Sequence, residues 1–229
     1  MESTPFLTPR PCVRGFSLIE MLVSLGIIVI ITAIVLLGQS NFNRSLVLVD
    51  TAYTIAFTLR QAQTLGLSSK KFGTIQNAGY GVHFVGETPT AYELFADSLP
   101  AAPGNSQGGL CVGHSAQSGA DAKPGNCLYD SISERVNAYT LNRGFTIKKV
   151  CGKDSSGTLR CSGSEGGNYL DVLDITFLRP NTQASILGLR SGVPLELTSA
   201  SIYVSSPDGD QVRCVNITKV GQVAVGTCL

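Results

Sequence analysis

The N-terminal part of the chain contains one long apolar stretch. Apolar side chains fill residues 16–37 almost without a break, and the run is interrupted only by Ser17, Glu20, Ser24, Gly26 and Thr32. As an α-helix, these residues would be about 33 Å long, which is enough to cross a hydrocarbon core of about 30 Å. The pattern therefore predicts a transmembrane helix over residues 16–37.

Beyond this stretch, apolar residues recur with a helical period. Spacings of four, three, four and three residues place one stripe on a single helix face, made of Leu48, Ala52, Ile55, Leu59 and Ala62. Gly66 is suited to a helix C-terminus. We therefore expect one continuous helix over residues 16–66, with an outer half that packs on an apolar surface.

After residue 71 the pattern changes to alternation with a period of two, which is typical of strands. The predicted strands are 80–85, 91–96, 136–141, 145–150, 170–178, 195–205, 212–219 and 222–225. Turns are predicted at 205–210 and 219–222. Residues 99–126 are rich in Gly, Pro, Ala and Ser and predict a long irregular loop. The predicted fold class is α+β: a long transmembrane and amphipathic N-terminal helix, then an antiparallel β domain over residues 67–229.

The flanks of the apolar stretch predict its orientation. Arg10 and Arg14 precede it, so the N-terminus should stay in the cytoplasm and residues after 37 should lie outside it. A cleaved secretory signal is the alternative. Such a signal has a shorter apolar region of roughly 7–15 residues followed by small residues, and Gly-Gln-Ser at 38–40 matches that cleavage pattern poorly.

Glu20 is the one carboxylate inside the predicted span, where a charge is costly and usually functional. Residues 14–23 read Arg-Gly-Phe-Ser-Leu-Ile-Glu-Met-Leu-Val. This segment resembles the processing site of type IV prepilins and pseudopilins. The resemblance implies that a prepilin peptidase cuts between Gly15 and Phe16, that Phe16 becomes N-methylated, and that Glu20 serves assembly. Residues 1–15 would then be a leader peptide. Unlike many major pilins, the chain has no proline between Pro11 and Pro89.

The C-terminal half extends the resemblance. Residues 175–180, 195–204 and 212–225 are similar to the H-type minor pseudopilins of type II secretion and to related minor pilins, all of the pilin fold. The resemblance implies a subunit of a type IV pilus or secretion pseudopilus, which begins in the bacterial inner membrane with its β domain in the periplasm. Its implied partners are other pilins, prepilin peptidase, the inner-membrane assembly platform and membrane lipid.

Charge argues against an electrostatic nucleic-acid binder. The chain has 17 Lys+Arg and 16 Asp+Glu, and loss of Glu2, Arg10 and Arg14 with the leader would leave fifteen of each. Nucleic-acid binders normally carry a basic excess. A pilus-borne module that binds DNA or another surface ligand remains the alternative function, and it would need a local patch around Arg190, Arg213 and Lys219.

Six of the seven cysteines lie after the predicted span: Cys111, Cys127, Cys151, Cys161, Cys214 and Cys228. An even number outside the cytoplasm favours disulfides. Six cysteines allow fifteen pairings; sequential pairing is favoured because each pair encloses a short, turn-rich stretch. A zinc site is the competing interpretation, but the Cys-x₂₋₄-Cys spacing typical of such sites is missing.

Candidate catalytic chemistry is sparse. The two histidines, His83 and His114, lie on a predicted strand and in the predicted loop. The sequence contains neither a Gly-x-Ser-x-Gly nucleophile motif nor a phosphate-binding loop. Asp208 and Asp210 could offer oxygens to Ca²⁺, but turn formation is the favoured role. We therefore expect neither an enzyme nor a resident cofactor or metal.

Overall fold

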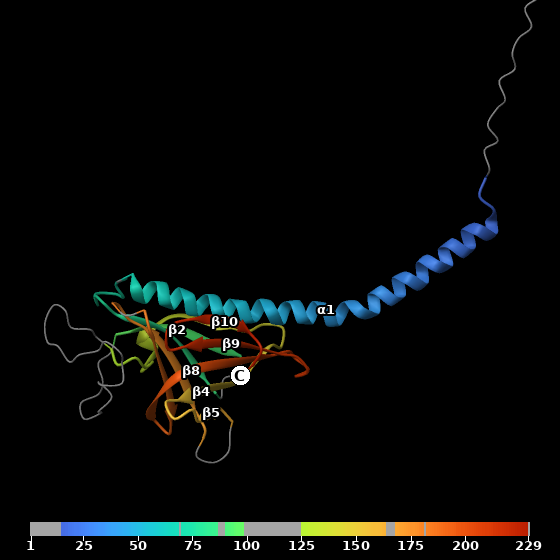
Figure 1. Ribbon diagram of the computed structural model, residues 1–229. Helices are drawn as coiled ribbons and strands as arrows, with labels where there is room; N and C mark the ends of the chain where they lie inside the picture. The colour runs from blue at the N-terminus through green and yellow to red at the C-terminus, as the bar shows by residue number, and fades with distance from the viewer. Residues whose placement is uncertain are drawn as a thin grey trace, which may run out of the picture. The chain divides into compact units, whose positions relative to one another are not determined.

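The computed structural model describes residues 15–68, 70–86, 90–98, 125–163, 168–180 and 182–228. The class is α+β, with the long N-terminal helix α1 (Leu18–Leu67) followed by antiparallel strands (Figure 1). The strands are β1 (Gly79–Val85), β2 (Ala91–Asp97), β3 (Arg135–Thr140), β4 (Thr146–Asp154), β5 (Leu159–Cys161), β6 (Val172–Phe177), β7 (Ala184–Arg190), β8 (Val193–Ser205), β9 (Val212–Thr218) and β10 (Val223–Gly226). One 3-10 turn, η2 (Ile132–Glu134), precedes β3. The chain divides into two compact units, residues 1–43 and residues 44–229.

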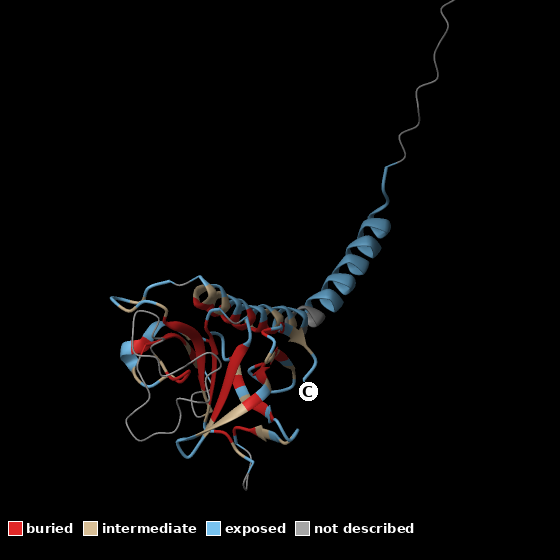
Figure 2. Ribbon diagram, turned by 60° about the vertical axis from the view of Figure 1, so that its left-hand side comes forward, coloured by how far each residue is buried: buried red, intermediate tan, exposed pale blue. Residues whose placement is uncertain are grey.

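The first unit contains the apolar half of α1. Leu18–Leu36 has a mean hydropathy of 2.7 and none of it is buried within the protein. Figure 2 shows this part of the helix in the colour of exposed residues. A fully exposed apolar surface of this length is unfavourable in water and suits a lipid environment.

In the second unit, the predicted apolar stripe of α1 is confirmed as a core face. Its members are at most 1% exposed: Leu48, Ala52, Ile55, Leu59 and Ala62. They belong to one hydrophobic cluster with inward-facing residues of the sheet, such as Val82 of β1 and Ile175 of β6. The other side of the same helical turns is exposed and includes Tyr53 and Phe57.

The strands form one sheet that forks at the long strand β8. The main path runs β10-β9-β8-β7-β6-β1-β2-β3, while β4 pairs with β8 and β5. β7 pairs with residues 193–196 of β8, and β4 pairs with residues 197–205. The two branches therefore leave β8 at successive positions along its length.

The strand prediction was wrong in omitting β5 and β7. β7 is a central strand between β6 and β8, and its first five residues are all buried. A strand with both faces covered has no polar alternation, so the period-two signal is lost. The apolar run Ile-Leu-Gly-Leu at 186–189, between turn residues at 180–182 and 191–192, was the available signal. β5 has only three residues, too few for any periodicity to be seen.

The structure also tests the predicted helix end and the two predicted turns. α1 continues through Gly66 to Leu67 rather than stopping at Gly66. The last turn is confirmed: the Gly221 N–H donates to the Thr218 carbonyl at 2.8 Å, and Gly221 has φ +84°. The turn between β8 and β9 is confirmed by the bond from Gly209 N–H to the Ser206 carbonyl, 2.9 Å. Of the predicted loop 99–126, residues 99–124 lie outside the described residues.

Candidate processing and assembly site

The residues around the predicted cleavage point form a short non-helical segment immediately before α1. Gly15, Phe16 and Ser17 have no regular secondary structure, and Phe16 is 75% exposed. No described atom lies within 4 Å of the place where a Cβ on Gly15 would be. The peptide bond between Gly15 and Phe16 therefore lies outside the helix, and the described residues leave it accessible.

Ser17 starts the helix. Its hydroxyl accepts a hydrogen bond from the Glu20 N–H at 3.3 Å, and its carbonyl accepts bonds from the N–H groups of Glu20 and Met21 at 3.1 and 3.2 Å. A serine in this position satisfies N–H groups that lack a partner at every helix N-terminus. The cap fixes the first turn, so Phe16 stands before the helix and Glu20 within it.

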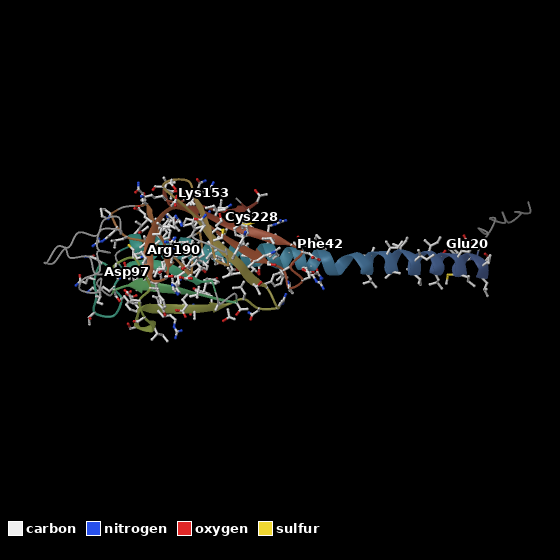
Figure 3. The ribbon with its side chains drawn as sticks, turned by 90° about the horizontal axis from the view of Figure 1, so that it is seen from below. Glu20, Phe42, Asp97, Lys153, Arg190 and Cys228 are labelled. Carbon is white, nitrogen blue, oxygen red and sulfur yellow. A yellow bond between two sulfur atoms is a disulfide. The ribbon has the colours of Figure 1, made fainter. Side chains whose placement is uncertain are left out.

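Glu20 lies in the first turn of α1, near the start of the exposed helix in Figure 3. Its side chain is exposed, and it makes no ion pair with any residue that the structure describes. Its backbone carbonyl accepts the Ser24 hydroxyl at 2.7 Å. The position favours a negative charge because of the positive end of the helix dipole, while the apolar residues that follow are suited to lipid. A single carboxylate is thus held at the edge of the longest apolar surface of the chain.

These features belong to a known signal. Residues 10–36 match the prokaryotic N-terminal methylation motif. This type IV prepilin-like signal covers the non-helical segment, Glu20 and the membrane-length helix, and it supports a pilin-like protein that prepilin peptidase processes. The apolar helix near the N-terminus fits membrane anchoring of such a protein. Searches of curated proteins and of solved structures found no match to the chain.

Two disulfides lie in the described part of the β domain: one joins β4 to β5, and the other joins β9 to the chain end. Cys151 and Cys161 are directly paired residues on β4 and β5 and are disulfide-bonded. Cys214 of β9 is bonded to Cys228 near the chain end. Both are pairs of the sequential scheme. Cys127 is also disulfide-bonded, but its predicted partner Cys111 lies outside the described residues, so that pairing stays a prediction.

A group of buried carboxylates, which the sequence analysis missed, holds the segment at 126–130. The carboxylate of Asp97 accepts the N–H groups of Asn126 and Cys127, both at 2.8 Å. Glu134 accepts the N–H groups of Ser98 at 2.8 Å and Asp130 at 2.9 Å. Burial raises the pKa of Asp97 well above its usual value, although the two N–H donors oppose this shift. Acidic residues at loop borders give no periodic signal, so only their spatial convergence reveals the role.

His83 belongs to the same side of the sheet. Its Nδ1 lies 2.6 Å from an oxygen of Asp174, and its ring packs on Tyr129 with 4.4 Å between ring centroids. The second oxygen of Asp174 accepts the Tyr129 N–H at 3.2 Å. The His83 ring therefore has its polar and ring contacts within the β domain. These contacts of His83 and Asp174 position the segment that carries Tyr129, so the role of His83 is structural.

The basic patch that the alternative function needs is not assembled. Arg190 is paired with Val193 at one end of β8, whereas Arg213 is paired with Val204 near the other end. Eleven residues of strand separate these positions, about 36 Å at roughly 3.3 Å per residue. Lys219 forms an ion pair with Glu196. The three cations therefore do not form one phosphate-binding surface.

Asp208 has the role of a turn former. It accepts hydrogen bonds from the Ser206 hydroxyl and, at 3.4 Å, from the Asp210 N–H. It also pairs with Arg44 at 2.7 Å. The Ser206 hydroxyl is the main cause that lowers the pKa of Asp208. Among the described residues, no group of three or more His, Cys, Asp or Glu side chains is placed to hold a metal ion.

Proposed function

We propose that this chain is a minor pilin or pseudopilin, a structural subunit that is trimmed by prepilin peptidase and assembled into a type IV pilus or a type II secretion pseudopilus. The observation that carries the proposal is the order of features within the methylation motif. A non-helical Gly15 and Phe16, a helix cap at Ser17 and Glu20 in the first turn precede a membrane-length apolar helix.

The proposed sequence of events follows from this order. The span inserts in the inner membrane with the N-terminus in the cytoplasm and the β domain in the periplasm. The peptidase cuts between Gly15 and Phe16, and Phe16 is methylated. The assembly platform then moves the subunit from the lipid into the filament, where the apolar helix surface contacts other pilins. Lipid tails are as apolar as the helix surface, so this transfer has no hydrophobic driving force of its own, and helix–helix packing in the filament replaces the contacts with lipid.

Gly15 offers the most direct test of processing. Nothing in the described chain requires a glycine there, because a Cβ would have open space. We therefore assign the glycine to the needs of the peptidase, which must approach the backbone closely. N-terminal sequencing of membrane-extracted protein should give methylated Phe16, and Gly15→Leu should accumulate uncut precursor. A mature start after residue 39 or 40 would contradict the proposal and indicate a secretory signal.

The alternative function, a pilus-borne module that binds DNA, finds less support. Its three candidate cations are dispersed, and one of them is paired with Glu196. A gel-shift titration at several salt concentrations tests it, because phosphate contacts make affinity fall as salt rises. Strong, salt-dependent retardation that Arg190→Ala weakens would restore this alternative.

A further inference from the structure

The two ends of the main sheet path differ in how well their outer edges are protected. β10 has four residues, and its Val223 carbonyl accepts a hydrogen bond from the Arg60 guanidinium at 3.3 Å. Beside its end, the Asn216 amide donates to the Thr227 carbonyl at 3.1 Å. Polar side chains therefore occupy outward-facing groups at this edge, which limits pairing with another strand.

β3, at the opposite end, is open. It pairs only with β2, and it forms the lower border of the β domain in Figure 3. The Leu141 N–H donates to the Thr90 carbonyl. In an antiparallel ladder every second residue of a strand bonds to the neighbouring strand, so the backbone groups of Tyr139 and Asn137 bond to β2. The N–H and C=O groups of Ala138 and Thr140 then point outward. Within the part of the chain that the structure describes, no residue bonds to them.

In the described part of the chain, β3 has the usual edge protection only at its start, where Arg135 and a bulge lie. Residues 136–140 contain no proline and no charged side chain, and a bulge is found only at the start, near residue 135. Five of the six β3 residues are exposed, including Val136 at 41%. Natural sheets blunt an exposed edge with lysine, proline, bulges or a covering element. An unprotected edge is a template for an added strand.

A hollow lies beside β3 on each face of the sheet. On the α1 face, a cavity of about 540 Å³ is lined by apolar residues such as Leu46, Ile55 and Tyr139 and also by polar ones such as Asp50, Thr54 and Arg143. On the other face, a cavity of about 300 Å³ is lined by Glu93, Tyr129, Ile132 and Arg135, among others. Successive side chains of an extended segment point to opposite faces, so a strand added to β3 would direct alternate side chains toward the two hollows.

The hollows differ in chemistry. In the larger one, Leu46, Ile55 and Tyr139 can contact an apolar side chain, beside polar groups such as Asp50 and Thr54. In the smaller one, Glu93 Oε2 is buried, and no donor among the described residues is placed to bond to that oxygen, while Oε1 lies 3.2 Å from Arg135. The Glu93 carboxylate also interacts with the Tyr129 hydroxyl and, after burial, contributes to the raised pKa of Tyr129. A buried acceptor without a donor is costly. A donor such as a lysine ammonium from an added strand would satisfy it.

We infer that the open edge of β3 is a docking site for an extended segment of another protein chain, bound by β-strand addition, with apolar side chains toward α1 and a donor side chain toward Glu93. Backbone hydrogen bonds would supply affinity and the two hollows specificity.

A second copy of this chain is a less suitable occupant. Two β3 edges would pair antiparallel across a two-fold axis normal to the sheet, which keeps each face of one copy on the same side as that face of the other copy. On the face of Glu93, β3 itself offers Val136, Ala138 and Thr140, because Ala138 is paired with Glu93. None of these three side chains is a cationic donor.

Peptide binding tests the inference without any filament. Full-length protein in detergent micelles is titrated with ten-residue peptides that alternate Val with Lys, Thr or Glu. We expect the Val/Lys peptides to bind most tightly, and the Val/Glu peptides about tenfold more weakly or worse. Binding should slow hydrogen exchange at the Ala138 and Thr140 amides, with little change at Asn137 and Tyr139, which β2 already protects.

Two variants locate the binding. Ala138→Pro removes an outward N–H and no ladder bond, and Ala138→Lys places a charge on the edge while keeping the backbone; each should weaken binding about tenfold or more. Val220→Lys, at an exposed turn, is the matched control and should bind normally. Glu93→Gln should reduce the preference for Lys over Thr.

Three outcomes would overturn the inference. The first is that none of the alternating peptides binds; the second is that binding is unchanged in both folded Ala138 variants. The third is a peptide-free dimer, seen by light scattering and lost in Ala138→Pro, which would identify a second copy as the occupant. None of these bears on cleavage at Gly15, so the proposed function stands or falls separately.

Discussion

Gly66 of α1 lies directly against the backbone of Phe177 in β6: a Cβ at Gly66 would be 2.2 Å from the Phe177 carbonyl oxygen. The contact brings the end of the helix onto the centre of the sheet, where Phe177 is fully buried. Glycine is present because the two backbones approach closely, and the helix continues past it to Leu67.

We predict that Gly66→Ala destabilises the β domain. In an unobstructed helix this change would stabilise by up to about 1 kcal/mol, but here the new methyl group meets backbone that cannot move aside. An overpacking cost of about 1–3 kcal/mol should outweigh the gain. Thermal unfolding of the full chain in detergent measures the result. Gly26→Ala, where a Cβ meets no described atom within 4 Å, is the control, and equal stability of both variants would contradict the packing argument.

The second prediction concerns Asp97 and pH. Burial raises the pKa of Asp97 well above that of an ordinary aspartate, so between about pH 4 and the raised pKa the folded state binds more protons than the unfolded state. The contribution of Asp97 to the free energy of unfolding therefore falls as pH rises through this window. Relative to Asp97→Asn, which cannot titrate, the wild type should lose stability from about pH 4 toward neutral pH.

Denaturant titrations of both proteins across this pH range provide the measurement. Asp130 also has a raised pKa, caused first by burial and then by Glu134. It is present in both proteins, so only the part of its titration that depends on the charge of Asp97 enters the difference. If the difference in the free energy of unfolding between wild type and Asp97→Asn is constant with pH, the two N–H donors offset the effect of burial. If it changes in the opposite direction, the donors outweigh burial.

The third prediction is that the Cys214–Cys228 disulfide stabilises the C-terminal hairpin. It closes a loop with a sequence separation of 14, worth roughly 3 kcal/mol in the chain-entropy description of the unfolded state. Cys214→Ala with Cys228→Ala should lower the free energy of unfolding by about that amount. Non-reducing peptide mapping of the wild type should show no free thiol after residue 15 and a Cys111–Cys127 link; a link between Cys127 and another cysteine would refute the sequential scheme.

Periodicity carried most of the sequence prediction. It located α1, its core stripe and the strands that alternate between a covered and an open face. It failed at β7, where both faces are buried. It placed the end of the helix to within one residue, but it could not show the close approach of Gly66 to Phe177, because a single residue carries no trace of a distant carbonyl. The N-terminal motif could be recognised because the residues that form it follow one another in the sequence. Asp97, Glu134 and the open edge of β3 depend on strand order and register, which are set by contacts far apart in the chain.

The fourth prediction tests Glu20 in assembly. A carboxylate within an apolar span carries a cost of a few kcal/mol unless it is compensated. Cleavage after Gly15 would create an ammonium group at Phe16. In the structure Phe16 stands outside the helix, before the Ser17 cap. We propose that Glu20 meets the Phe16 ammonium of a neighbouring subunit and so sets the axial register of the filament.

Glu20→Ala should leave insertion and leader cleavage intact, because a more apolar helix enters the membrane more easily. Incorporation into filaments should fall sharply for Glu20→Ala and for the near-isosteric Glu20→Gln, since neither retains the negative charge. Glu20→Asp retains the charge and should be incorporated better than either. Co-purification with partner pilins, compared at equal abundance of cleaved protein in the membrane, measures the effect. If both neutral variants are incorporated as well as the wild type, Glu20 only extends to the lipid headgroups, as long polar side chains near helix ends do, and the register must be set elsewhere on α1.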